Sequence, residues 1–369
     1  MTHVVVVGCG VVGAAIAYEL SQFPDLSITV LDRQPPAQAA TGAALGVLMG
    51  VISQKVKGNA WRMRQASLQR YETLIPELEA IAQHPIPYNR QGILMLCFDA
   101  EALPRWQQLA ETRQTQGWQL EIWNQEKLHF RCPQINPEKG LAAIYSPQDR
   151  QVDPTALTLA LVKAARAKGV TFHFEAQVLA LESESADGLQ TSQQIQTTAG
   201  KFSADWVLIA AGLGSTLLTQ AGIQPVDIRP VLGQALQLQL EHPLGDRHFQ
   251  PVITGDDIHI VPLSNGQYWI GATVEFPNDA GEVSADSAQL EGVLEGAIAF
   301  CPALAQAKIL KTWSGLRPRP YGRPAPIIEP LSGYTNVTLA TGHYRNGVLL
   351  APATAQAVCK LLAKREHLY

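Results

Sequence analysis

The chain has 369 residues, 46% of them hydrophobic and 16% charged, with a formal net charge of −4. This length allows two domains, and the composition is that of a globular protein with enough apolar residues for a large core. The small net charge, without any block of like charges, argues against a basic nucleic-acid-binding surface.

Neither the N-terminus nor the cysteines indicate secretion, a membrane span or a metal site. The apolar stretch of residues 4–18 follows no Lys or Arg, is interrupted by glycines, and is shorter than the ~20 residues of a membrane helix. The five cysteines are scattered and never spaced C-x-x-C, as expected for buried thiols in a reducing compartment. We therefore predict a cytoplasmic protein without disulfides, bound metal or membrane span.

A buried strand and a glycine-rich turn open the chain. Four consecutive valines at residues 4–7 predict a strand covered on both faces, as in a parallel sheet. The turn Gly8-Cys9-Gly10-Val11-Val12-Gly13 leads into a helix predicted over residues 11–22. Its G-x-G-x-x-G spacing permits a tight turn, backbone approach to a pyrophosphate at the helix N-terminus, and close packing of helix on strand.

A second strand, predicted over residues 28–32, ends in Asp32, whose carboxylate can accept hydrogen bonds from ribose hydroxyls. Strand, turn, helix and acid together predict dinucleotide binding, although this motif alone does not separate FAD from NAD. The following residues 39–46 are small, which lets the backbone come close to a flat or charged group, or simply pack tightly.

The middle of the chain alternates helices and strands. Asp153 as N-cap, Pro154 at the first helical position and Gly169 at the end delimit one helix. The helix predicted over residues 61–82 is expected to break near Pro76. A further helix is predicted over residues 101–116, and strands over residues 91–98, 170–174, 178–182 and 206–211.

The pattern changes after residue 230. Leu236, Leu238 and Leu240 alternate with glutamines, which predicts a sheet with one wet face. Strands over residues 258–263 and 268–273 and an amphipathic helix over residues 290–298 continue this region. The chain then returns through residues 311–319 and 337–341 to a last helix. We therefore predict an α/β dinucleotide-binding domain with an inserted antiparallel α+β domain.

Two stretches near the C-terminus carry a more specific signature. They are Trp313-Ser314-Gly315-Leu316-Arg317-Pro318-Arg319-Pro320 and Gly342-His343-Tyr344-Arg345-Asn346-Gly347. With the opening glycine motif and residues 41–48, they occur in the order typical of the D-amino-acid oxidase family of FAD enzymes, which the sequence resembles from end to end. Within that family, the last motif is most similar to that of glycine oxidases of the thiamine pathway.

The resemblance implies a Rossmann-like FAD-binding domain (residues 1–85, 140–225 and 310–369) and a substrate-binding domain (residues 86–139 and 226–309). FAD would be held non-covalently, because residues 313–321 lack the cysteine to which related sarcosine oxidases attach theirs. The residues expected to contact FAD are Gly8, Gly10, Val11, Val12, Gly13, Asp32, Arg33, Ala40, Thr41, Leu45, Gly46, Val47, Val178, Gly212, His343, Tyr344, Arg345, Asn346, Gly347, Val348 and Leu349.

Three residues are expected to bind the substrate. The planar guanidinium of Arg317 could hold a carboxylate through two bonds, and the surrounding motif favours this role over a surface ion pair. The resemblance implies a second substrate-side arginine, Arg345, beside the flavin. His259 stands where relatives usually carry a tyrosine. It could bind the carboxylate with a charge that varies near neutral pH, or be a half-buried histidine facing solvent.

The last helix is expected to begin at Gly347. The resemblance implies that its N-terminus faces the pyrimidine edge of the flavin, where helix N–H groups would favour reduction. The same residues would also suit an ordinary glycine turn before a core helix. His343 is expected to be a structural residue beside the flavin, and no residue beyond the flavin is predicted to be catalytic.

The implied reaction is oxidation at Cα of glycine, sarcosine or a small D-amino acid, by hydride transfer to flavin N5 with molecular oxygen as acceptor. The imine would be hydrolysed or passed to a thiazole-synthesis partner. Two alternatives stay open: a D-amino-acid dehydrogenase that reduces a quinone, and a non-catalytic dinucleotide-binding protein. A homo-oligomer is compatible with the sequence, which does not give the number of subunits.

Overall fold

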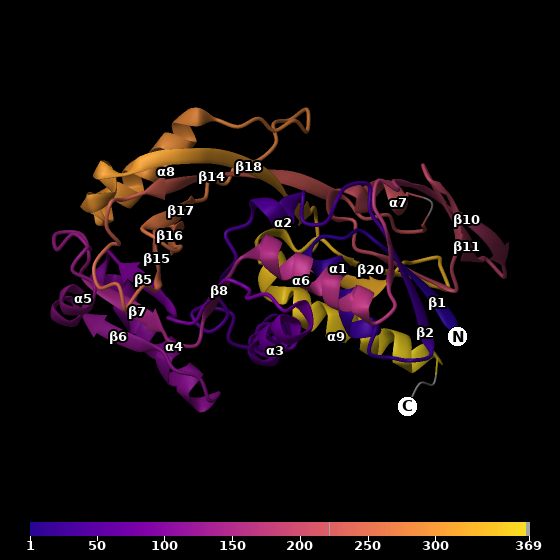
Figure 1. Cartoon of the computed structure of the whole chain (residues 1–369), viewed down its shortest axis with the longest axis horizontal. Coiled ribbons are helices and arrows are strands. Elements are labelled where there is room, and N and C mark those ends of the chain that lie inside the picture. Colours follow the sequence, from indigo (N-terminus) through magenta and orange to yellow (C-terminus); the bar gives the residue numbers. More distant parts are fainter. Residues whose placement is uncertain (221, 367–369) are drawn as a thin grey trace.

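The computed structural model describes residues 1–220 and 222–366, and its two large sheets occupy different halves of the molecule (Figure 1). The first sheet has six strands, in the order β19 (Ile327–Pro330), β20 (Val337–Thr341), β13 (Trp206–Ile209), β1 (Thr2–Val7), β2 (Leu26–Leu31) and β9 (Thr171–His173). All its pairs are parallel except β19–β20, which is antiparallel. This confirms the predicted α/β domain with a parallel sheet around the valine strand.

The second sheet has eight strands, and its pairs are antiparallel except for the parallel pair β5–β15. Its order is β18 (Lys308–Pro320), β14 (Ile228–Gln239), β17 (Gln267–Gly271), β16 (Ile258–Pro262), β15 (Val252–Gly255), β5 (Ile93–Cys97), β7 (Ala142–Ser146) and β6 (Glu121–Asn124). The helix α8 (Ser287–Phe300) packs against one face of this sheet, as the predicted α+β insertion requires.

Two three-stranded sheets and the remaining helices complete the fold. The small sheets are β10 (Val178–Ala186), β11 (Leu189–Thr197) and β12 (Gly200–Ser203), and β3 (Val47–Leu48), β8 (Arg150–Val152) and β4 (Tyr88–Asn89). The helices are α1 (Val11–Leu20), α2 (Ala40–Ala43), α3 (Gly58–Ala82), α4 (Leu103–Thr115), α5 (Gln125–Arg131), α6 (Pro154–Ala167), α7 (Ser215–Leu218) and α9 (Gly347–Glu366).

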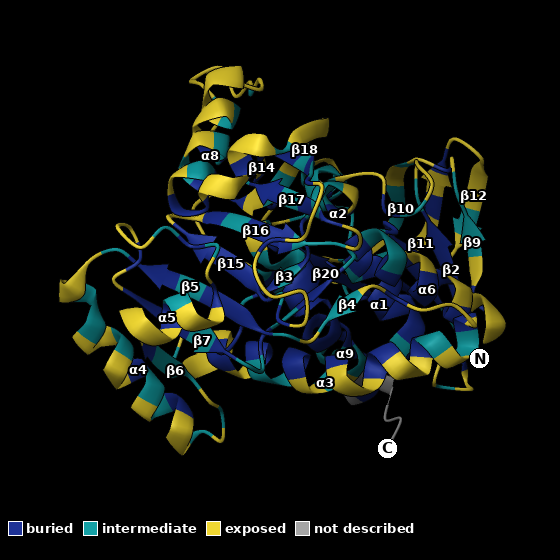
Figure 2. Ribbon diagram, turned by 60° about the vertical axis from the view of Figure 1, so that its left-hand side comes forward, coloured by how far each residue is buried: buried dark blue, intermediate teal, exposed yellow. Residues whose placement is uncertain are grey.

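The valine strand β1 faces two separate cores. Val4 and Val6 pack against the helices α1, α3, α6 and α9, whereas Val5 and Val7 pack toward the β10–β12 side. All four valines are buried, so the strand is covered on both faces as predicted. Figure 2 shows buried strands at the centre of the molecule and exposed faces on α4 and α8.

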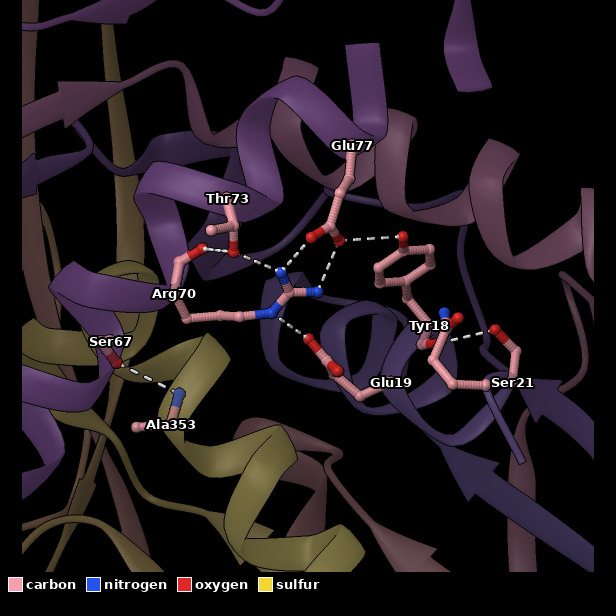
Figure 3. Close-up of polar contacts among 9 residues, drawn as sticks. Tyr18, Glu19, Ser21, Ser67, Arg70, Thr73, Glu77 and Ala353 are labelled. Atoms are coloured by element: carbon pink, nitrogen blue, oxygen red, sulfur yellow. Dashed lines mark hydrogen bonds and ion pairs between the residues drawn. The ribbon is translucent and has the colours of Figure 1, made fainter. Parts of the chain in front are cut away.

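The helix α3 is tied to α1 and α9 by polar side chains (Figure 3). Arg70 donates to Glu19 of α1 at 2.8 Å and to Glu77 of its own helix at 2.7 Å. The hydroxyl of Ser67 accepts from the backbone N–H of Ala353 in α9 at 3.2 Å. These contacts fix α9 against the layer of helices that covers the six-stranded sheet.

The break predicted near Pro76 is wrong, because α3 runs through Pro76 without interruption. Leu74, Ile75 and Leu78 around it are all buried in the core. Their packing outweighs the ~3 kcal/mol cost of a proline inside a helix. Local propensity was overruled here by tertiary contacts.

Two other features differ from the sequence-based picture. The hairpin β10–β11 turns at Asp187 and Gly188, both with positive φ, and is far longer than the single strand predicted over residues 178–182. In addition, β7 and β18 lie in the eight-stranded sheet, although the predicted boundaries placed β7 and residues 310–320 of β18 in the FAD-binding segments. The two-domain division itself stays a prediction, with these two strands belonging to the second sheet.

Candidate active site

The glycine turn joins β1 to α1 and leaves the helix N-terminus without a side-chain cap. Gly8 has a φ of +105°, which favours glycine. A Cβ at Gly13 would lie 1.9 Å from the carbonyl oxygen of Gly8, so these two glycines are required by the turn and by close packing. A Cβ at Gly10 would meet only the Thr41 hydroxyl at 3.1 Å among the described atoms. The backbone at Gly10 is therefore the open side of the turn.

Asp32 and Thr41 both bind this turn. The Asp32 carboxylate accepts from Cys9 N at 2.6 Å and from Gln34 N at 2.9 Å. The Thr41 hydroxyl accepts from Val11 N at 3.0 Å, in place of a helix cap. A carboxylate offers about four acceptor positions, so Asp32 retains acceptor capacity for ribose hydroxyls.

The segment of small residues contacts the eight-stranded sheet and the small sheet that contains β8. Trp313 Nε1 of β18 donates to the carbonyl of Ala43 at 3.1 Å, and Gln151 Nε2 of β8 donates to the carbonyl of Leu45 at 3.0 Å. Leu45 packs on the eight-stranded sheet, with Val47 beside it. Gly46 is required by packing, since a Cβ there would lie 1.8 Å from the Val152 oxygen. Of the predicted contact residues in this segment, Thr41 thus binds the start of α1, and Leu45 and Val47 pack against the eight-stranded sheet.

The start of α9 is fixed from inside the helix. A short 3-10 turn (Tyr344–Asn346) precedes it, and Gly347 is its first residue, as predicted. The ring of His343 is buried and hydrogen-bonds through Nε2 with the Thr354 hydroxyl at 2.9 Å. Burial lowers the pKa of His343 to about 4, so the ring is neutral at pH 7. Tyr71 of α3 adds a bond to the carbonyl of Val348 at 2.6 Å.

Arg317, Arg345 and His259, here called the substrate-side cluster, come from β18, the turn before α9, and β16. Arg317 Nη1 donates to the carbonyl of Leu232 at 2.9 Å. Arg345 faces Asp257 at 3.4 Å. Burial and the charge of Arg345 lower the pKa of Arg317. The three predicted residues therefore lie close enough for the charge of Arg345 to lower the pKa of both Arg317 and His259.

His259 differs from the sequence-based expectation of a charge that varies near neutral pH. Burial, followed by the charge of Arg345, lowers its pKa to about 4, with a smaller effect of Arg317 in the same direction. Its Nδ1 hydrogen-bonds with the Thr254 hydroxyl at 2.9 Å. The ring is therefore neutral at pH 7 and is held by β15.

The other predicted contacts lie around the glycine turn. Gly212 follows β13 at the same edge of the parallel sheet, and its carbonyl accepts from Thr341 at 3.3 Å. Val178 begins β10, two residues after Ala176, whose N–H donates to the Asp32 carbonyl. Arg33 is exposed beside Asp32. The roles of all these residues remain predictions.

Two buried charged residues near the site were missed from the sequence. Asp149 accepts from the backbone N–H groups of residues 50, 51 and 52, each at 2.8 Å. Arg113 donates to the carbonyls of residues 51, 53 and 55 and stacks on Trp61 at 3.7 Å. Together they hold the loop that follows β3. Neither lies in a motif, so no sequence signal pointed to them.

Within residues 1–220 and 222–366, no group of three or more His, Cys, Asp or Glu side chains could hold a metal ion. Over the same residues, no helix has both the length and the apolarity needed to cross a membrane.

A family model described as FAD dependent oxidoreductase (DAO) matches residues 3–361. The chain belongs to the DAO family. Its cofactor is therefore FAD, as predicted. The open backbone at Gly10, the N-terminus of α1 and the acceptor capacity of Asp32 fit the pyrophosphate and ribose of that cofactor. The resemblance seen in the sequence is confirmed.

Named relatives of this DAO-family chain include glycine oxidases. It is 32% identical over 368 residues to the bifunctional protein ThiO/ThiG of Synechocystis sp., covering 98% of this chain and 51% of that protein. It is 29% identical to the glycine oxidase of Bacillus licheniformis, covering 97% of this chain and 92% of the relative. The chain thus spans about half the length of the curated ThiO/ThiG relatives it matches.

The fold is also that of solved glycine oxidases. The crystal structure of glycine oxidase from Geobacillus kaustophilus superposes with a TM-score of 0.87 at 24% identity, covering 99% of this chain and 95% of that one. The predicted combination of a Rossmann-like FAD-binding part and an antiparallel α+β part is therefore confirmed.

Proposed function

We propose that this DAO-family oxidoreductase is a glycine oxidase, which oxidises glycine, sarcosine or a small D-amino acid at Cα and reduces oxygen to hydrogen peroxide. The observation that carries the proposal is the substrate-side cluster. The half-buried guanidinium of Arg317 on β18 lies in the same electrostatic surroundings as Arg345 in the turn before α9 and the neutral imidazole of His259 on β16. Such a group suits a small anion such as an amino-acid carboxylate.

Each residue of the cluster has a separate role in this proposal. Arg317 binds the carboxylate and orients the substrate, and the neutral ring of His259 donates a further hydrogen bond to it. The N-terminus of α9, fixed by His343, would stabilise negative charge on bound FAD through its backbone N–H groups. The chemistry supplied by bound FAD is acceptance of a hydride from Cα at N5. Placement of the reacting atoms is worth roughly 7–11 kcal/mol when the geometry is near that of attack.

The imine product would then be hydrolysed to glyoxylate and ammonia. The relatives named ThiO/ThiG are about twice as long as this chain. Their composite name supports the predicted thiazole-synthesis partner and a place in thiamine biosynthesis. The cytoplasmic location, the non-covalent attachment of FAD and a homo-oligomeric state stay predictions.

Anaerobic mixing of the flavoprotein with a panel of amino acids tests this function. Glycine and sarcosine should bleach the flavin absorbance, and admission of oxygen should restore it with formation of peroxide. Bleaching by D-alanine but not by glycine would contradict the glycine assignment. Recovery with a soluble quinone but not with oxygen would identify a dehydrogenase instead.

A further inference from the structure

Two glycines face each other where β14 and β18 pair. Gly233 of β14 lies opposite Gly315 of β18, and Val231 lies opposite Arg317. The space beside Gly315 is taken by α2, because a Cβ there would lie 2.3 Å from the Cβ of Ala43. The space beside Gly233 is filled by Arg317, a member of the substrate-side cluster.

The guanidinium of Arg317 occupies the place of a side chain at Gly233. A Cβ at Gly233 would lie 2.2 Å from Nη2 and 2.3 Å from both Cζ and Nη1 of Arg317. Such nearly equal distances place the guanidinium face over the glycine. Arg317 therefore folds back along β14 by one diagonal step of the antiparallel pair.

The backbone next to Gly233 completes the support. The Leu232 carbonyl accepts from Arg317 Nη1 at 2.9 Å and from the backbone N–H of Glu275 at 3.0 Å. A guanidinium has five N–H donors. Within the described part of the chain, the bond to Leu232 is the hydrogen bond that Arg317 makes. The other donors are available to a ligand.

We propose that Gly233 is a positioning residue for the substrate. Its lack of a side chain lets the Arg317 guanidinium rest on β14, with its remaining N–H groups directed to the carboxylate of an amino acid. This inference rests on the proposed function, because it takes Arg317 as the carboxylate anchor.

A methyl group at Gly233 would displace the guanidinium rather than the strand. Gly233 lies outside the positive-φ region, so alanine suits its backbone. The colliding atoms are the far end of a flexible side chain, and an ordinary contact needs more than 3.4 Å. Arg317 must therefore move by about 1 Å or more, and displacements of about this size can cost ~100-fold in activity.

The experiment compares Gly233→Ala, Arg317→Ala and the double variant as FAD-loaded proteins. The control is Gly292→Ala on α8, where a Cβ would meet nothing within 4 Å. Two readouts are the glycine dependence of anaerobic flavin reduction and the inhibition constant of acetate, which reports the carboxylate site alone. Thermal unfolding and flavin content report the fold.

We expect Gly233→Ala to bind glycine and acetate at least tenfold more weakly and to keep its flavin content. Gly292→Ala should behave like the parent in both measurements. The double variant should be no weaker than Arg317→Ala, because both changes disable the same guanidinium. If Gly233→Ala alone is unstable, the double variant should recover the stability of Arg317→Ala, since the clash is gone.

Three results would overturn the inference. The first is that Gly233→Ala binds glycine and acetate like the parent while Arg317→Ala binds them more weakly. The second is that the losses in binding of the two single variants multiply in the double variant. The third is that the double variant is as unstable as Gly233→Ala. The first leaves the proposed function intact. Unchanged binding in both single variants would instead remove Arg317 as the anchor, and with it the basis of the proposed function.

Discussion

The glycine turn before α1 and the substrate-side cluster are built from different groups: the first presents backbone atoms and the second presents side chains. The turn is made of neighbouring residues, and it offers backbone groups whose position depends on the absence of side chains at Gly8 and Gly13. The cluster gathers charged and polar side chains from β16, β18 and the turn before α9. Added volume at Gly8 or Gly13 would therefore meet backbone atoms, which cannot yield, whereas added volume at Gly233 beside the cluster would meet the movable guanidinium of Arg317.

Substitution of Gly13 by alanine should break the first region with the largest effect. The new Cβ would collide with the backbone oxygen of Gly8, which cannot move without distorting β1 or α1. We expect a loss of about 3 kcal/mol in the free energy of unfolding and poor retention of FAD. Chemical denaturation and the flavin-to-protein absorbance ratio measure both. The control Gly214→Ala, with its nearest contact at 3.6 Å, should resemble the parent, and parent-like Gly13→Ala would refute the packing argument.

Acid should destabilise the protein through His343. Its pKa of about 4 is below the ordinary value of 6.5, so the unfolded chain binds more protons between these pH values. Its contribution to stability is present above pH 6.5 and is lost as the pH falls toward 4, by roughly 3 kcal/mol in total. The free energy of unfolding, measured by denaturation at pH 7, 5.5 and 4.5, should therefore fall less steeply in His343→Gln. The exposed control His84→Gln should keep the parent's slope, and equal slopes in all three would contradict the assignment.

Removal of the Arg317 charge should disable the second region while sparing the first. Hydrogen bonds to charged groups contribute about 1.5–3 kcal/mol, so Arg317→Ala should raise the Michaelis constant for glycine at least tenfold and leave FAD bound. Steady-state kinetics and flavin content give the two measurements. Arg323→Ala removes an exposed arginine from the loop between β18 and β19, outside the cluster, and should have little effect. Unaltered kinetics in Arg317→Ala would exclude it from the site.

The smallest effect is expected at the rim of the glycine turn. Asp32→Ala removes the acceptor for Cys9 N and the proposed acceptor for the ribose. FAD should bind about tenfold more weakly, in line with ~1.5 kcal/mol for such bonds, as measured by titration of the apoprotein. The exposed Asp25→Ala is the matched control. Undiminished FAD affinity in Asp32→Ala would rule out the ribose contact.

The same contrast explains what could be read from the sequence. The glycine turn, Asp32 and the start of α9 at Gly347 follow from short-range patterns, and the structure places these elements where they were expected. The hydrogen bonds that Asp149 accepts from the backbone N–H groups of residues 50–52 span about a hundred positions, and periodicity does not encode such pairs.

Other features depended on tertiary context. The neutral state of His259 depends on its burial beside Arg345, which the sequence does not show. Pro76 was misread because core packing overrules local propensity. The hairpin at Asp187-Gly188 could have been predicted from the sequence, since Asp-Gly is a common two-residue turn.

Both partners of the His343–Thr354 bond belong to α9 or to the turn before it. The end of this helix thus carries its own brace, independent of whichever strands lie across from it. Exchange of the eight-stranded sheet for that of another family member would leave the brace untouched. Under the proposed function, side chains of the sheet that set substrate preference can then change without altering the internal support of the helix assigned to the cofactor.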